Sequence, residues 1–255
     1  MHIAWIDDDT PLPPTHLALP AQSEAPGLLA AGGTLNLARL EEAYSHGVFP
    51  WFGEGQPVLW WTLDPRMVLP VGEFRLTRSL RKTLARFVST PGCEIRCDSA
   101  FREVIETCSR TPRRGQDGTW IVPAMVDAYC AWHAAGKAHS VETWIDGELA
   151  GGLYGVHLGR MFFGESMFAR RTDASKIALA ALVALCRAHH VPLIDCQQST
   201  EHLASMGARE IPRDEFERHL ATHVPGPPAI ARWTYDPRLW AQLDERLAAP
   251  ASTAP

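Results

Sequence analysis

The amino-acid sequence predicts a mixed α/β (α+β) fold built on a mostly antiparallel central sheet. The first observation is a run of three segments separated by turns, each long enough for one strand, the first of which alternates apolar and polar residues. These segments are residues 138–145, 148–157 and 160–166. The turn between the first two, Asp146-Gly147, is typical of a tight β-hairpin. The second observation is the apolar run Ile177–Cys186, which predicts a buried helix packed against the sheet.

The composition is that of an ordinary globular protein. The chain has 255 residues, 46% of them hydrophobic, which is enough for one or two packed domains. We expect a small N-terminal domain at residues 1–66, a larger domain at 67–247 and a disordered tail at 248–255. The start of the chain is acidic, and its longest apolar run is ten residues. Because a membrane span needs roughly 20 apolar residues, we expect a cytoplasmic protein without a membrane partner.

The N-terminal part is expected to hold one helix and a dense group of aromatic residues. Residues 1–34 are rich in Pro, Ala and Gly, which favours turns. Leu37–His46 has the apolar spacing of a helix, and Gly47 is placed to end it. Between Val48 and Trp61 there are three tryptophans and two phenylalanines. This density predicts either a small aromatic core or a surface on which unpaired bases stack.

A basic segment follows. Between Phe74 and Arg114 the chain has ten Lys or Arg residues and four acids, a charge of +6 in a chain of net charge −5. The cations on or beside a helix predicted at Thr77–Phe87 are Arg75, Arg78, Arg81, Lys82 and Arg86. Because no acid occurs between Arg75 and Ser89, pairing within the helix cannot neutralise them. A solvated helix face is one interpretation. Contact with the phosphates of a nucleic acid is the other, and the clustering favours it.

Apolar spacing and turn residues predict further elements on both sides of the three-strand segment. The strands are expected at Met67–Pro70, Leu193–Asp195 and Arg209–Pro212, and the helices at Ser99–Cys108, Pro123–Ala135, Ala174–His189, Ser199–Met206 and Arg213–His223. Asp173 is placed to cap the helix that begins at Ala174.

Two acids at strand ends mark the candidate site. Glu165 ends the aromatic strand that contains Phe162 and Phe163, and Asp195 ends an apolar strand. Burying a carboxylate is costly unless it is paired, and polar residues at strand ends tend to face a crevice. A capping role for each acid is the plainer interpretation. Asp195 and Gln197 stand two residues apart, so on an extended strand both side chains point to the same face.

Four segments around these acids match the wording of a known family. They are Gly164-Glu-Ser-Met-Phe168, Asp173-Ala-Ser-Lys176, Leu193-Ile-Asp-Cys-Gln197 and His202…Ser205-x-Gly-Ala208. Together they resemble leucyl/phenylalanyl-tRNA–protein transferases, and the resemblance runs from about Gly27 to about His219. It implies an acetyltransferase-like (GNAT-like) fold. It also implies transfer of Leu or Phe, and also Met, from aminoacyl-tRNA to the α-amine of proteins that begin with Arg or Lys. That transfer marks them for degradation by the N-end rule route.

The resemblance also implies which residues bind the donor. Tyr44, Trp51, Trp120 and Tyr129 match positions that receive the 3′ adenosine end of aminoacyl-tRNA. The apolar pocket for the donor side chain is expected to consist of Leu153, Phe162, Met167, Leu182 and Ile194. The basic residues beside and on the predicted helix at Thr77–Phe87 would contact the tRNA backbone. The resemblance implies no coenzyme and no metal, and we expect a monomer.

The catalytic residues implied by the resemblance are Asp195 and Gln197, together with Glu165, which matches a position that contacts the acceptor. In this chemistry Asp195 would orient the side-chain amide of Gln197. The amide oxygen of Gln197 would accept a hydrogen bond from the attacking amine, so that Gln197 orients the amine.

Three other classes of protein explain parts of the sequence. An acetyl-coenzyme A-dependent N-acetyltransferase needs a glycine-rich phosphate-binding turn, and the candidate turn, Arg170-Arg-Thr-Asp-Ala-Ser, lacks the glycines. A cysteine hydrolase would use Cys196 and His202, without an evident third group to orient the histidine. The six cysteines include no Cys-x-x-Cys pair, which predicts reduced thiols. A non-catalytic RNA-binding module would explain the basic and aromatic residues but not the two acids.

Overall fold

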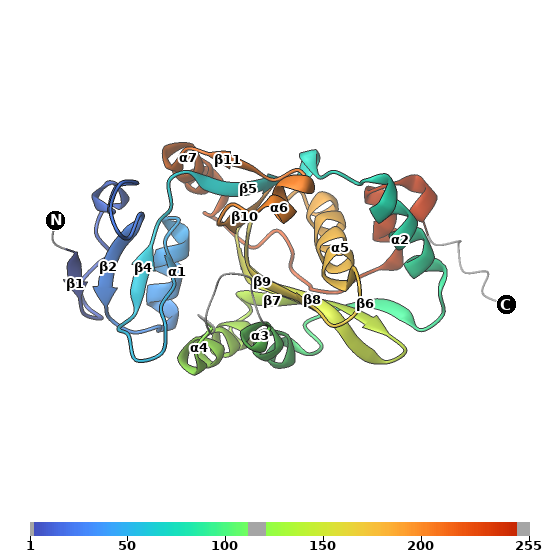
Figure 1. The fold of residues 1–255 in the computed structure, drawn as a ribbon, viewed down its shortest axis with the longest axis horizontal. Helices are drawn as coiled ribbons and strands as arrows, with labels where there is room; N and C mark the ends of the chain where they lie inside the picture. The colour runs from blue at the N-terminus through green and yellow to red at the C-terminus, as the bar shows by residue number, and fades with distance from the viewer. Residues whose placement is uncertain (1–2, 112–120, 249–255) are drawn as a thin grey trace.

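The computed structural model describes residues 3–111 and 121–248, which form two β-sheets with helices around them (Figure 1). The smaller sheet lies at the N-terminal end of the molecule and has four strands in the order β1-β2-β4-β3. Its strands are β1 Ala4–Ile6, β2 Leu28–Gly32, β3 Phe49–Pro50 and β4 Leu59–Trp61. Helix α1, Leu37–Ser45, lies beside this sheet (Figure 1).

The second sheet has seven strands and is mostly antiparallel. Its order is β11-β5-β10-β9-β8-β7-β6, and β9 and β10 form the parallel pair. The strands are β5 Arg66–Pro70, β6 Cys93–Cys97, β7 Ala138–Ile145, β8 Glu148–Leu158, β9 Met161–Ala169, β10 Leu193–Gln197 and β11 Arg209–Ile211. This arrangement confirms the predicted mixed α/β class with a mostly antiparallel central sheet.

Helices cover both faces of the seven-stranded sheet. Helix α5, Ala174–Ala188, packs on one face, and α3, Phe101–Arg110, and α4, Pro123–Ala134, pack on the other (Figure 1). Because side chains alternate along a strand, Leu153 on β8 belongs to the core under α5 and its neighbour Tyr154 to the core under α3 and α4. The remaining helices are α2 Arg78–Ser89, α6 Glu201–Ser205 and α7 Arg213–His223, with 3-10 helices at Thr15–Leu17, Val71–Glu73, Pro237–Gln242 and Glu245–Leu247. None of the helices in the described ranges combines the length and the apolar composition of a membrane span.

The three-strand segment was predicted well, and some of the strands outside it were missed. β7 and α7 have the predicted bounds, and both residues of the Asp146-Gly147 turn have positive φ, as a tight hairpin requires. The expectation of turns in residues 1–34 is wrong for β2, whose five residues are all buried and therefore show no alternation. Strand β6 was also missed. Asp173 does not cap α5 through its side chain, which instead accepts a hydrogen bond from Lys176 Nζ at 2.8 Å.

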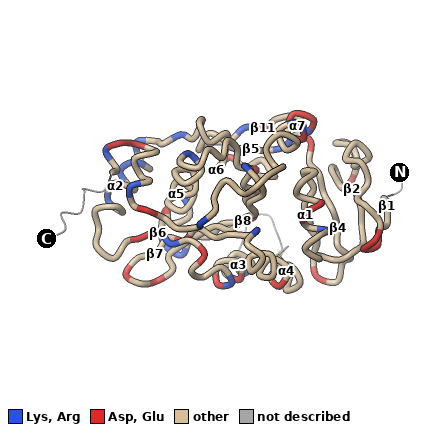
Figure 2. The backbone as a smooth tube through the Cα atoms, turned by 180° about the vertical axis from the view of Figure 1, so that it is seen from behind, with Lys and Arg blue, Asp and Glu red and all other residues tan. Residues whose placement is uncertain are grey.

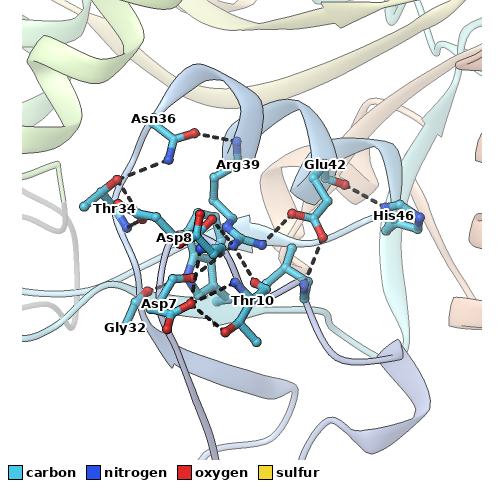
Figure 3. A network of polar contacts seen from close by, with 12 residues as sticks. Asp7, Asp8, Thr10, Gly32, Thr34, Asn36, Arg39, Glu42 and His46 are labelled. Carbon is cyan, nitrogen blue, oxygen red and sulfur yellow. Dashed lines mark hydrogen bonds and ion pairs between the residues drawn. The ribbon is translucent and has the colours of Figure 1, made fainter.

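A buried arginine fixes helix α1 against the N-terminal loops (Figure 3). Arg39 is 4% exposed and pairs with Glu42 on the same helix. Its Nη2 donates to the backbone oxygens of Asp7, Asp8 and Thr10 at 3.1, 3.2 and 2.6 Å. The Asn36 side chain accepts from the Arg39 backbone N–H at 2.8 Å, which caps the first turn of α1. These contacts set the position of α1, which carries Tyr44 into the site described next.

Candidate active site

A cavity of about 480 Å³ opens where β8, β9 and β10 meet α5, α6 and the loop after β3. All five residues predicted for the donor side-chain pocket line it, namely Leu153, Phe162, Met167, Leu182 and Ile194. Phe49 and Trp51 line it from the N-terminal part of the chain. The three predicted catalytic residues, Glu165, Asp195 and Gln197, also line it. The cavity therefore joins an apolar wall to a group of buried polar side chains.

Glu165 lies in the middle of β9 and not at its end as predicted, because the strand continues to Ala169. It receives hydrogen bonds from three elements. Its Oε1 accepts from Tyr44 Oη of α1 at 2.6 Å and from Gln197 Nε2 of β10 at 2.8 Å. Its Oε2 accepts from Tyr129 Oη of α4 at 3.2 Å. The hydroxyls of Tyr44 and Tyr129 also contact each other. These four side chains form a buried polar group, and Glu165 and Gln197 line the cavity.

Burial is the largest cause of the shifted pKa values in this group. Removal from water raises the pKa of Glu165 to about 7, and the nearby charge of Asp195 adds to the increase. The hydrogen bonds from Tyr44 and Tyr129 and the charge of Arg66 act in the opposite direction. Burial, and then the charge of Glu165, also raise the pKa of both tyrosines. Glu165 therefore changes its charge close to neutral pH.

Asp195 has a different environment because Arg66 neutralises it. Arg66 Nε donates to Asp195 Oδ1 at 2.8 Å, and Nη2 donates to Oδ2 at 2.6 Å. The guanidinium also donates to the Gly47 carbonyl at 3.2 Å and lies over the rings of Phe49 and Phe216. The sequence reasoning missed Arg66. A single arginine beside the apolar strand Met67–Pro70 was the available signal, because such a strand is buried and its cation then needs a partner.

The contact between Asp195 and Gln197 differs from the one expected. Asp195 Oδ1 accepts from the backbone N–H of Gln197 at 2.9 Å, whereas the Gln197 side-chain amide donates to Glu165. The reason is an irregularity in β10: the register with β5 shifts between Asp195 and Gln197, and Gln197 has a φ of 59°. A bulge of this kind breaks the simple alternation of side chains. Asp195 thus fixes the backbone of Gln197, and Glu165 fixes its side chain.

The residues predicted to receive the adenosine end of the tRNA lie in different environments. Trp51 lines the cavity, and its ring packs against that of Trp61, with 5.2 Å between the ring centroids. Tyr44 and Tyr129 are 1% and 0% exposed and face Glu165. Trp120 lies outside the described residues.

The predicted tRNA-backbone residues lie on or beside α2, at the opposite end of the molecule from the N-terminal sheet (Figure 2). Arg75, Arg78, Lys82 and Arg86 are exposed. Arg81 is half-buried, and its Nε pairs with Asp244 at 2.8 Å. The absence of acids within the helix therefore did not keep Arg81 unpaired, because its partner comes from the C-terminal segment. The other four carry the exposed positive charge of this surface.

Two further groups of side chains bear on other chemistry. Burial raises the pKa of the Cys196 thiol, and burial lowers the pKa of His202, so the pair is poorly suited to form a thiolate nucleophile. Asp98, His133 and His139 have donor atoms within 4.8 Å of one another and could hold a metal ion. They lie outside the residues that line the cavity. Their hydrogen bonds, His139 Nδ1 with Asp98 at 2.8 Å and His133 Nδ1 with the Ala138 carbonyl at 2.8 Å, account for them as structural groups.

An apolar cavity that ends in a few convergent polar side chains, one with a strongly shifted pKa, is the arrangement of an enzyme active site. The family model described as "Leucyl/phenylalanyl-tRNA protein transferase" matches residues 68–221, and the one for its N-terminal domain matches residues 33–64. The chain belongs to the leucyl/phenylalanyl-tRNA protein transferase family.

Relatives of that name match almost the full length. The protein from Leptothrix cholodnii is 65% identical over 247 residues, covering 96% of this chain and 96% of its own length. The protein from Methylibium petroleiphilum is 63% identical over 240 residues, covering 94% and 90%. Among solved structures, "The structure of L-PGS from Bacillus licheniformis" is 12% identical, with a TM-score of 0.38, and the match covers 69% of this chain and 57% of that one.

Proposed function

We propose that this chain transfers leucine or phenylalanine, and also methionine, from aminoacyl-tRNA to the α-amine of proteins that begin with Arg or Lys. The observation that carries the proposal is that Glu165 and Gln197, joined by a hydrogen bond, line the apolar cavity. A Leu, Phe or Met side chain has the size and the apolar character to fit in such a cavity. A cationic N-terminal side chain is the natural partner of a buried carboxyl group.

The reaction forms one bond and breaks another. The α-nitrogen of the acceptor attacks the ester carbonyl carbon, the carbon–oxygen bond to the tRNA breaks, and the 3′ oxygen leaves with a proton that the amine has lost. Because the ester is already activated, holding the two reactants in line supplies much of the rate. The side-chain carbonyl oxygen of Gln197 accepts a hydrogen bond from the amine and orients the amine. Asp195, neutralised by Arg66, holds the Gln197 backbone in place.

Two surfaces support binding of the tRNA. The exposed cations Arg75, Arg78, Lys82 and Arg86 lie on or beside α2 and suit phosphate contacts. Trp51, which lines the cavity from the N-terminal part of the chain, offers a flat ring on which the terminal adenine stacks. We further propose that the enzyme acts as a monomer in the cytoplasm and that its products enter the N-end rule degradation route.

The test is transfer of labelled Leu from charged tRNA to a peptide that begins with Arg, with an N-acetylated copy of the peptide as control. Transfer to the free peptide alone supports both the reaction and the α-amine acceptor. Parallel reactions receive acetyl-coenzyme A or uncharged tRNA in place of the donor. Acetylation of the peptide would replace the proposal with an N-acetyltransferase, and salt-sensitive tRNA binding without transfer would replace it with an RNA-binding module.

A further inference from the structure

The contacts of Glu165 require more hydrogens than the two tyrosines carry. Tyr44, Tyr129 and Glu165 form a closed ring of oxygen–oxygen contacts: Tyr44 to Glu165 Oε1, Tyr129 to Glu165 Oε2, and Tyr44 to Tyr129. Each contact needs one hydrogen between its oxygens. The two phenols supply two. If Glu165 were ionised, one of the three contacts would place lone pairs against each other in a buried site.

A proton on Glu165 completes the ring. The contact between Oε2 and Tyr129 then reverses its direction: the Glu165 hydroxyl at Oε2 donates to Tyr129, Tyr129 donates to Tyr44, and Tyr44 donates to Glu165 Oε1. Gln197 Nε2 donates to Oε1 in either charge state, so it does not change the count. Every contact of the ring has one hydrogen only when the carboxyl group is neutral.

The surrounding charges are consistent with this state. Among the described residues, no Lys or Arg nitrogen lies within ion-pair distance of Glu165, whereas Asp195 on the neighbouring strand has Arg66. The groups that face Glu165 are Tyr44 from α1, Tyr129 from α4, Gln197 and Asp195 from β10 and Arg66 from β5. Tyr154 from β8 and His202 from α6 line the same cavity. Burial without a paired cation favours a neutral carboxyl group, in agreement with its pKa of about 7.

We propose that Glu165 carries a proton shared with Tyr44 and Tyr129 in the free protein, and that a cationic acceptor side chain expels this proton as it binds. The inference rests on the proposed function, because it concerns the acceptor of that reaction. The binding step balances: the neutral carboxyl group and the cation form a carboxylate–cation pair, and one proton passes to the solvent. Recognition of an N-terminal Arg or Lys is then linked to pH through Glu165, and Tyr44 and Tyr129 set the pH at which the link operates.

The kinetic test compares two acceptor peptides that differ only in the charge of the first side chain, one beginning with Arg and one with citrulline. Both have the same free α-amine, with an ordinary pKa of about 8, so its ionisation cancels in the ratio of their kcat/KM values. In the wild type this ratio should rise about tenfold per pH unit at acidic pH and become constant above the titration of Glu165. In Glu165→Gln it should be small and constant.

A spectroscopic measurement tests the proton directly and does not depend on turnover. Difference infrared spectra at pH near 6 should show a protonated carboxyl band in the wild type that Glu165→Gln lacks. Adding the Arg peptide should remove the band, and adding the citrulline peptide should leave it. A ratio that stays constant with pH while the Arg peptide is still a good acceptor would overturn the inference and leave the proposed function standing. Absence of transfer to both peptides would instead count against the proposed function. In that case the infrared band and its response to the Arg peptide still decide whether Glu165 holds and releases the proton.

Discussion

Arg66 and Asp195 form a two-point ion pair inside the protein, with distances of 2.8 Å from Nε to Oδ1 and 2.6 Å from Nη2 to Oδ2. The two residues are 1% and 0% exposed. The pair joins β5 to β10, and through the Gly47 carbonyl it reaches the end of α1. Two acids on the neighbouring strands β9 and β10 therefore have different charge environments, because Asp195 is paired with a cation and Glu165 is not.

Removing one partner of this pair should destabilise the protein strongly. Asp195→Asn leaves the Arg66 guanidinium buried without a counter-charge, and we expect the free energy of unfolding to fall by about 3–5 kcal/mol. Urea denaturation followed by circular dichroism measures it. Asp214→Asn, which removes the exposed partner of Arg218, is the matched control and should leave the unfolding midpoint unchanged. An equal effect of the two substitutions would contradict the buried-pair account.

Gln197 and Cys196 are neighbours with different expected roles. Gln197→Ala should lower kcat by roughly 10²-fold, because it removes the group that orients the attacking amine. Cys196→Ala should keep nearly full activity, since burial raises the pKa of its thiol and the mechanism does not use it. Single-turnover transfer of Leu measures both. Loss of activity in Cys196→Ala with Gln197→Ala still active would favour the cysteine hydrolase alternative.

The wall of the cavity should determine the preference among donors. Leu182→Ala enlarges the cavity, and the ratio of kcat/KM for Phe over Leu should rise by about tenfold or more. Leu185→Ala is the control, because Leu185 is equally buried on α5 but does not line the cavity. Both variants should lose roughly 2–5 kcal/mol of stability, while the control keeps the wild-type ratio. Equal ratios in the two variants would show that Leu182 does not contact the donor.

The exposed cations of α2 should contribute to tRNA binding through salt-dependent attraction to phosphates. Replacing Arg78 or Lys82 by Ala should weaken binding and reduce the slope of log affinity against log salt by about one for each phosphate that the variant no longer neutralises. Arg81→Ala should have a smaller effect, because Arg81 already pairs with Asp244. Arg218→Ala on α7 serves as a control outside the predicted surface. Unchanged slopes in Arg78→Ala and Lys82→Ala would place the tRNA elsewhere.

The raised pKa of Glu165 should also appear in the stability of the protein. The group titrates near 7 when folded and near its ordinary value of 4.5 when unfolded, so between these values the folded protein binds more protons. The contribution of Glu165 to the free energy of unfolding should therefore be greatest below about pH 4.5. It should fall as pH rises to about 7, by an amount on the order of 3 kcal/mol. Glu165→Gln should remove this dependence. Parallel unfolding curves of the two proteins at pH 5 and 8 provide the comparison.

The sequence predicts features that depend on residues close together in the chain, and it does not predict contacts between residues far apart. The alternating pattern of residues 138–145 reveals β7. Phe162 and Met167 both line the cavity as predicted, but they are five positions apart on β9, whose register with β8 shifts between them, so alternation alone does not place them on one face. β2 has no polar face and shows no pattern. The pairing of Arg66 with Asp195 spans 129 positions, and that of Tyr44 with Glu165 spans 121. No local rule connects residues so far apart, so the charge of each acid could not be deduced.

Tyr44 comes from α1, beside the small sheet, while Glu165 and the cavity wall belong to the large one. A chain cut at the exposed Asp64-Pro65 turn and freed of its first part would keep the strands and the helix that carry all five predicted pocket residues. It would lack one of the three hydrogen-bond donors to Glu165, along with Trp51. The junction between the two sheets therefore completes the group of hydrogen-bonded side chains around Glu165.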